Sequence, residues 1–154
     1  MDPDISIDDE AWKAVADLES LATRAVATAL GLVHRADAQV AINFADDETL
    51  ARLNTQWRGK PRPTNVLSFP AAPGMTPPDE PAFLGDVILA AGVTQAEARE
   101  QAKSWADHTT HLIIHGVLHL AGHDHETEHE AAIMEALEIR AMAALGLPNP
   151  YELG

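Results

Sequence analysis

Residues 108–125 read HTTHLIIHGVLHLAGHDH, and this stretch decides both the expected fold and the expected chemistry. At about 100° of rotation per helical residue, four of its histidines fall within an arc of about 80° on one helix face. The other positions up to residue 121 are mostly apolar, so the pattern predicts a helix whose back is buried at the centre of the protein. The four histidines are His108, His111, His115 and His119.

A metal ion would satisfy several of these imidazoles at once, whereas separate burial would require a polar partner for each ring. Zinc ligands lie about 2.0–2.1 Å from the ion, and an i, i+4 pair such as His115 and His119 can bring two nitrogens that close. The third ligand must come from outside the helix. Gly122 can adopt a left-handed conformation that turns the chain back, so that His125 joins the pair.

Three protein ligands with an open fourth position are typical of catalytic zinc, whereas structural zinc has four protein ligands. The chain has no cysteine, which excludes thiolate zinc sites, disulfides and thiol catalysis. An all-imidazole set favours zinc among the common metals. We interpret His111, His123 and His129 as polar neighbours or surface residues rather than ligands.

The same histidine spacing occurs in zinc peptidases, which leaves a second function open. Those enzymes place a glutamate directly after the first histidine as the general base. Here that position is Gly116, which can neither accept a proton nor polarise a bound water. Peptide hydrolysis is therefore the second hypothesis.

The composition is typical of one soluble globular domain spanning residues 1–154, with 46% apolar and 22% charged residues. No apolar run reaches the roughly 18 residues of a membrane span, and the acidic N-terminus does not resemble a signal peptide, which predicts a cytoplasmic protein. A net charge of −14 argues against nucleic-acid binding through a general positive field. Nevertheless, four of the ten basic residues cluster in an acid-free stretch: Arg52, Arg58, Lys60 and Arg62.

The remaining periodicities predict an α+β protein with a small mixed sheet and amphipathic outer helices. Alternating apolar residues predict strands at about 5–7, 39–45, 65–69 and 84–89. Helical spacing predicts helices at about 10–30, 46–57, 94–105, 108–121 and 127–145. Two capping boxes mark helix starts, Thr94 with Glu97 and Thr127 with Glu130.

The sequence HGVLHLAGHDH at 115–125 resembles the signature of the YbeY family, the bacterial zinc-dependent endoribonucleases of rRNA maturation. Other blocks resemble the family in order and spacing, and they read LNTQWRGK at 53–60, TNVLSF at 64–69, LGDV at 84–87 and LGLPNPY at 145–151. The resemblance covers residues from about 50 to the C-terminus, and the first 35 residues match only in outline.

This resemblance implies a zincin-like domain that acts in rRNA processing, notably 16S rRNA 3′-end maturation, and in ribosome quality control. The family's three zinc ligands carry over onto His115, His119 and His125, and its functionally important arginine onto Arg58. The expected partners are ribosomal RNA and the small ribosomal subunit, with a ribosomal protein or an assembly GTPase adding affinity. We expect neither a membrane nor DNA as a partner.

The resemblance gives Arg58 a role, and the positions of other residues suggest roles near the ligands. Arg58 is expected to clamp a phosphate and offset the charge that develops in the transition state, and Lys60 and Arg62 to guide the RNA backbone. Asp124 either orients a metal-bound imidazole or caps the last helix. Asp86 either faces the cleft or is an ordinary strand residue. No general base is assigned, since Asp124, Asp86 or another histidine could serve.

Three classes of function follow from these observations. The leading hypothesis is a single-strand-specific, zinc-dependent endoribonuclease. The second is a zinc-dependent hydrolase of another bond, the peptide bond included. The third is a ribosome-assembly binding factor whose zinc is structural.

Overall fold

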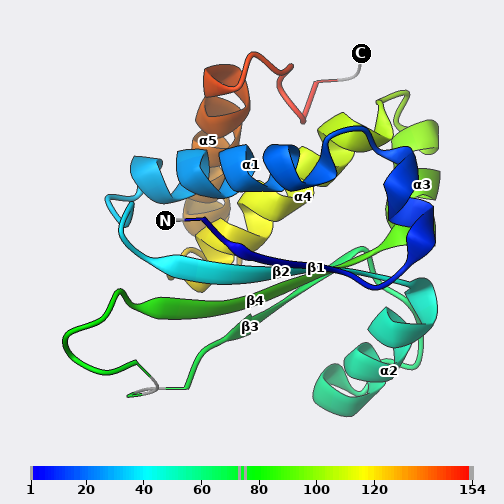
Figure 1. Ribbon diagram of the computed structural model, residues 1–154. Coiled ribbons are helices and arrows are strands. Elements are labelled where there is room, and N and C mark those ends of the chain that lie inside the picture. The colour runs from blue at the N-terminus through cyan, green and yellow to red at the C-terminus, as the bar shows by residue number, and fades with distance from the viewer. Residues whose placement is uncertain (1, 73, 75, 153–154) are drawn as a thin grey trace.

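The computed structural model describes residues 2–72, 74 and 76–152, which form one four-stranded sheet with helices packed against it (Figure 1). The strand order is β1-β2-β4-β3; β1, β2 and β4 are parallel, and β3 is antiparallel to β4. The expected α+β class with a small mixed sheet is confirmed. The strands are β1 (Asp4–Ile7), β2 (Gln39–Ala45), β3 (Val66–Pro70) and β4 (Phe83–Ala90).

The helices divide between the two faces of the sheet. In Figure 1, α1 and α4 cross one face and α5 stands beside them, while α2 lies on the opposite side. Among the described residues, no helix is both long and apolar enough to cross a lipid bilayer. The helical elements are the 3-10 helix η1 (Glu10–Ala14), α1 (Leu18–Leu32), α2 (Asp47–Arg58), α3 (Ala91–Glu100), α4 (Trp105–Leu120) and α5 (Glu128–Ala144).

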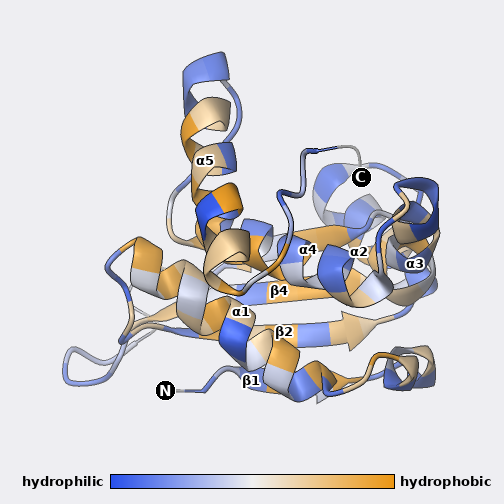
Figure 2. Cartoon of the chain, turned by 90° about the horizontal axis from the view of Figure 1, so that it is seen from above, coloured by the Kyte–Doolittle hydropathy of each residue, from blue (hydrophilic) through white to orange (hydrophobic). Residues whose placement is uncertain are grey.

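Alternation along the strands separates two apolar clusters. One set of strand side chains belongs to the main core with α1 and α4, and Figure 2 shows β2 and β4 as largely hydrophobic. A smaller cluster, which includes Leu50 of α2 and Leu67 of β3, packs α2 against the other face. The strand residues of the main core are Val40, Ile42, Phe44, Val87 and Leu89.

Helix α4 lies close against the sheet at Gly116. A Cβ atom added there would lie 2.8 Å from Cγ1 of Val87 and 3.1 Å from Oγ of Ser68. The Ser68 hydroxyl also donates a 3.3 Å hydrogen bond to the Gly116 carbonyl. Helix and sheet therefore meet at a position that leaves no space for a side chain.

The helix predicted at 10–30 is two elements in the structure. The 3-10 helix ends at Ala14, Asp17 adopts a left-handed φ of 53°, and α1 begins only at the next residue. The indole of Trp12 is fully buried and donates a 2.9 Å hydrogen bond to the Ala45 carbonyl. This tertiary contact holds η1 against the end of β2. Gly31, expected to end the helix, lies within α1.

The capping box predicted at Thr94 and Glu97 is wrong, because α3 begins three residues earlier, at Ala91. The N-terminal amides of α3 find a partner in another helix, since the Val93 N–H donates a 3.0 Å hydrogen bond to the Asp47 carboxylate of α2. A side chain distant in the sequence thus satisfies a group that a local cap would otherwise serve.

Replacing Gly116 with alanine is expected to lower the free energy of unfolding by about 1–3 kcal/mol, because the added methyl overlaps a stiff, buried valine. Gly31→Ala in α1 is the matched control. Nothing lies within 4 Å of a Cβ at that position, so the higher helix propensity of alanine should raise the free energy of unfolding by up to about 1 kcal/mol. Urea unfolding followed by circular dichroism measures both changes, and effects of the same sign would contradict the packing described.

Candidate active site

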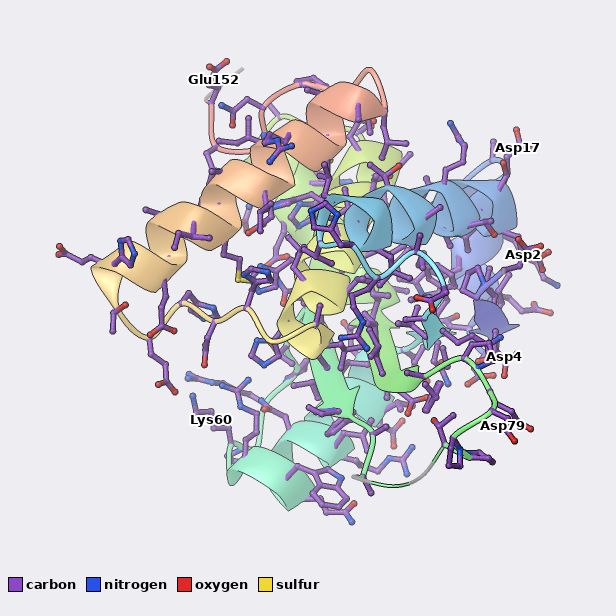
Figure 3. All side chains as sticks on the ribbon, turned by 90° about the vertical axis from the view of Figure 1, so that its left-hand side faces the viewer. Asp2, Asp4, Asp17, Lys60, Asp79 and Glu152 are labelled. Carbon is purple, nitrogen blue, oxygen red and sulfur yellow. The ribbon has the colours of Figure 1, made fainter. Side chains whose placement is uncertain are left out.

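A pocket of about 720 Å³ lies between α2, β3, α4 and the loop that follows α4. Each of these elements contributes polar side chains to its wall. In Figure 3 that loop runs above Lys60, which follows the end of α2. The polar residues of the wall include Arg58, Ser68, His115, His119, Asp124 and His125. The structure therefore brings the three expected ligands and the expected catalytic arginine to one pocket.

The turn at Gly122 places the third histidine beside the first two. Gly122 adopts a left-handed φ of 104°, and the N–H of the next residue donates a 3.0 Å hydrogen bond back to the Leu118 carbonyl. The ring centroid of His125 lies 5.6 Å from that of His115 and 6.5 Å from that of His119. The reversal of the chain predicted from the glycine is present.

Hydrogen bonds to acceptors outside the pocket wall determine which ring nitrogen of His115 and of His119 carries a proton. Nδ1 of His119 is 3.1 Å from the carbonyl oxygen of His123, which can only accept, so Nδ1 is the donor. Nδ1 of His115 lies 3.5 Å from Oε2 of Glu138, another acceptor. In neutral rings this leaves the lone pair on Nε2. An imidazole that binds a metal characteristically donates its other N–H to a carboxylate or carbonyl in this way.

The donor set therefore fits zinc, although the described residues contain no group of three or more metal-binding side chains already arranged to hold an ion. His115 and His119 are partly buried and fixed by their Nδ1 partners. The side chain of His125 is 59% exposed, so this ring is the one with space to adjust. Two imidazoles from the helix and one from the adaptable loop match the three protein ligands that a catalytic zinc site has.

The basic loop after α2 is held beside this pocket. Arg58 is the last residue of α2, and Gly59 ends the helix with a left-handed φ of 67°. The buried side chain of Asn54 donates a 2.9 Å hydrogen bond to the Arg62 carbonyl, which fixes the loop against the helix. Lys60 and Arg62 are exposed and lie outside the group that lines the pocket. Among the three basic residues Arg58, Lys60 and Arg62, only Arg58 lines the pocket.

Comparison with known proteins decides the family. The profile described as "Endoribonuclease YbeY" matches residues 4–146. The chain belongs to the YbeY family. Proteins named "Endoribonuclease YbeY" from Dinoroseobacter shibae and Paramagnetospirillum magneticum are 48% and 49% identical to it, over 97% and 92% of this chain and 90% of each relative. A relative of the same name from Rhodopseudomonas palustris is 46% identical over 92% of this chain and 85% of its own length.

A solved structure supports the fold. The solution structure of TM1509 from Thermotoga maritima is similar to this YbeY chain with a TM-score of 0.56 and 22% identity, over 97% of this chain and 99% of the other. The family profile and the curated relatives confirm the family resemblance that was inferred from the histidine motif and the other sequence blocks. The match also extends through the N-terminal region, where the sequence agreed only in outline.

Sequence reasoning missed Glu138, which connects the site of this YbeY protein to its C-terminal segment. Its side chain is 1% exposed. It accepts a 2.8 Å hydrogen bond from the Tyr151 hydroxyl and contacts ring nitrogens of both His111 and His115. A signal was present in the sequence, since Glu138 occupies a position on an otherwise apolar stripe of α5. The other buried members of that stripe are Met134, Ala141 and Met142.

The charge of Glu138 is stabilised inside the protein. Burial alone raises the pKa of a carboxyl, but the hydrogen bonds from His111 and His115 outweigh it and hold the pKa of Glu138 at about 2. Burial and the adjacent Glu138 charge both raise the pKa of Tyr151, so its hydroxyl stays protonated. The carboxylate therefore acts only as an acceptor, and it keeps a proton on Nδ1 of His115.

The first histidine of the α4 stripe has a supporting role. Nε2 of His108 lies 2.9 Å from Oε1 of Glu97, and Asn65 donates a 3.1 Å hydrogen bond to the same oxygen. Burial lowers the pKa of His108, and the carboxylate partly opposes this effect. His108 and His111 are thus each paired with a carboxylate outside the pocket wall. The stripe divides into two supporting histidines and two that line the site.

Of the two alternatives for Asp124, the capping role is wrong. Thr127 caps α5, because its hydroxyl accepts a 3.1 Å hydrogen bond from the Glu130 N–H, as its own capping box predicted. Asp124 instead lines the pocket, with Oδ1 3.9 Å from Nδ1 of His125. The carboxylate of Asp124 is therefore near the imidazole of His125, as the first alternative requires.

Asp86 lies on the opposite face of the sheet from the histidines. Its neighbours on β4, Gly85 and Val87, both face α4, so the alternation of a strand directs Asp86 the other way. It is absent from the pocket wall. Burial, and to a lesser extent the nearby Asp4, raise the pKa of Asp86. These observations favour the ordinary strand residue over the cleft acid.

Asp86→Asn is expected to stabilise the protein at neutral pH. Because folding raises the pKa of Asp86, this carboxyl favours the folded state below its unfolded pKa, and that benefit is lost as the pH rises through the folded pKa. Asparagine carries no charge to desolvate. Urea unfolding should therefore show a higher free energy of unfolding for the variant at pH 7 and no gain at about pH 3. A gain that persists unchanged at the lower pH would contradict the assignment.

Substitution of the buried carboxylate should destabilise the protein more than substitution of the tyrosine that donates to it. Glu138→Gln weakens the three charge-assisted hydrogen bonds from His111, His115 and Tyr151, and it is expected to lower the free energy of unfolding by about 3–5 kcal/mol, since such a bond contributes about 1.5–3 kcal/mol. Tyr151→Phe removes only one hydrogen bond to the carboxylate, with an expected loss of about 1–3 kcal/mol. Long-range ¹H–¹⁵N spectra of the histidine rings should show a changed tautomer equilibrium of His115 in Glu138→Gln alone. An unchanged His115 signal would show that the carboxylate does not hold the ring.

Proposed function

We propose that this chain is a single-strand-specific, metal-dependent endoribonuclease that acts in rRNA processing, as one hydrolase domain over residues 1–154. Its relatives are named "Endoribonuclease YbeY". The observation that carries the proposal is the composition of one pocket. Two imidazoles with engaged Nδ1 atoms, a third from the turn and a guanidinium all reach the same space.

One zinc ion per chain, held by His115, His119 and His125, would polarise a phosphate oxygen and lower the pKa of a bound water to near 7. The protein's own contribution begins with the orientation of these rings. The carbonyl of His123 and the carboxylate of Glu138 fix the two helical imidazoles, so little reorganisation is needed before binding. The number of proposed protein ligands, three rather than four, supports a catalytic rather than a closed, structural site.

Arg58 is proposed to bind the scissile phosphate. A guanidinium presents paired N–H donors that match two phosphate oxygens, and it offsets the extra negative charge of the transition state. Lys60 and Arg62, outside the pocket wall, would contact the RNA backbone to one side. For proton transfer, Asp124 is supported over Asp86, because only Asp124 among these two carboxylates lines the pocket.

The proposed substrate is ribosomal RNA, with 16S rRNA 3′-end maturation and ribosome quality control in the cytoplasm as its setting. The net charge of −14 supports a partner, because the few basic residues near the pocket bind an RNA backbone weakly on their own. The small ribosomal subunit, through a ribosomal protein or an assembly GTPase, would supply the additional affinity.

The peptidase alternative loses support at Gly116. The position that holds the general base in zinc peptidases packs here against Val87 and Ser68, with no space for a side chain. The third hypothesis, a ribosome-assembly factor with structural zinc, predicts binding to the small subunit without cleavage by the isolated protein.

The test is cleavage of an end-labelled single-stranded RNA by zinc-loaded protein, with the zinc content measured separately. His119→Ala should lose both zinc and cleavage. Arg58→Ala should keep zinc but cleave about 10²–10³-fold more slowly, by analogy with the loss of one oxyanion donor. His129→Ala, which changes an exposed histidine of α5, is the matched control and should behave as wild type.

Each outcome separates the hypotheses. Full activity of the metal-free His119→Ala protein would refute the proposed mechanism. Equal activity in all four preparations would indicate a contaminating nuclease. Co-sedimentation with the small subunit but no cleavage by the wild type would favour the assembly factor.

A further inference from the structure

Trp57 differs from the other two tryptophans of the chain in its exposure. Trp12 and Trp105 stack on each other with ring centroids 4.8 Å apart, and Trp12 is fully buried. Trp57 is 64% exposed, yet it belongs to the wall of the pocket that contains the three histidines. The large apolar ring thus remains in water at the entrance to the proposed active site.

The contacts of Trp57 leave room for a flat partner. The ring of Phe69 on β3 lies 6.0 Å away at an interplanar angle of 62°. This edge-type contact supports the indole without covering it as a parallel ring would. Trp57 and Arg58 are consecutive residues of α2, so their side chains leave the helix in different directions. Both nevertheless line this pocket, so a strand bound in it can contact the indole and the guanidinium.

Because the protein is strongly negative, a contact that does not depend on charge would help it to bind RNA. The acid-free segment 52–62 carries four positive charges, against a net charge of −14 for the whole chain. Charge attraction to RNA falls steeply with added salt, because it depends on counterion release. Stacking of a base on an aromatic side chain does not depend on that release and tolerates any base.

We propose that Trp57 is a stacking site for one unpaired RNA base, next to the nucleotide whose phosphate Arg58 binds. The inference rests on the proposed function for the nature of the substrate, and it adds a reason for single-strand selectivity. In a duplex, each base already stacks between its neighbours and cannot cover the indole unless it leaves the helix. An unpaired nucleotide meets no such cost.

The test measures binding with the full chain in the presence of a chelator, so that it does not depend on cleavage. A labelled single-stranded RNA is titrated at several salt concentrations with wild type, Trp57→Ala, Trp57→Phe and Lys60→Ala. Ile133→Ala is the matched control, because Ile133 is 44% exposed on α5 and lies outside the pocket wall.

Trp57→Ala should weaken binding about 10-fold at every salt concentration, while the slope of log K against log[salt] stays unchanged. Trp57→Phe should recover most of that loss, and Ile133→Ala should bind as wild type. Lys60→Ala should instead reduce the steepness of the slope by about 0.7. In the wild type, RNA should quench the fluorescence of the exposed indole, and a duplex of the same sequence should quench it much less.

Wild-type affinity of Trp57→Ala would overturn the proposal, as would a loss seen only as a changed salt slope. Normal RNA binding by Trp57→Ala combined with lost binding to the small subunit would overturn it in favour of a protein contact. The result is separable from the catalytic proposal. Stacking without zinc-dependent cleavage would leave this inference standing alone. Cleavage that needs His119, combined with wild-type RNA affinity of Trp57→Ala, would refute this inference alone.

Discussion

The absence of a side chain at Gly116 sets how closely α4 can approach the sheet, and the site depends on that distance. A single methyl group there would overlap Val87 of β4 and crowd Ser68 of β3. The Ser68 hydroxyl uses the same close approach to donate to the Gly116 carbonyl. With α4 fixed on the sheet, His115 and its partner one turn later project beside β3, where the pocket forms. The same packing leaves no space for a side chain at the position where a zinc peptidase carries its general base. One local constraint therefore positions two of the three candidate ligands, His115 and His119, and excludes the general base of a zinc peptidase.

Behind the histidines, the protein accepts a buried negative charge. An unpaired carboxylate at the position of Glu138 would be strongly destabilising, because a charge loses most of its hydration there. The hydrogen bonds from His111, His115 and Tyr151 offset this cost. The same bonds have a consequence at the pocket, since they keep the Nδ1 proton of His115 in place. The C-terminal segment that carries Tyr151 is thereby linked to the orientation of a candidate zinc ligand, although it lies far from that ligand in the sequence.

The sequence pattern predicted the structure correctly where interactions between neighbouring residues determine it. The spacing of the α4 histidines, the glycine turn and the cap at Thr127 all depend on neighbours within a few residues, and the structure contains each of them. Prediction failed where a distant partner decides. Glu97 matches a capping box but instead bonds His108 and Asn65, while Asp47 from another helix serves the start of α3. Glu138 was missed for the same reason, because its partners lie on other elements.

The acidic surface of the chain and its basic loop together constrain how RNA can approach. A net negative protein repels a polyanion at long range, so the strand is attracted only close to the short segment that Asn54 anchors beside the pocket. Within about one Debye length, roughly 8–10 Å, that segment dominates, and Arg58 is its member in the pocket wall. The protein attracts RNA weakly at a distance and contacts it specifically only at short range. It is therefore expected to bind RNA that a larger assembly holds close to the pocket more readily than free RNA. For the proposed cleavage of single strands, the same balance also limits cleavage of other RNA, because RNA that meets the protein without such an assembly dissociates quickly.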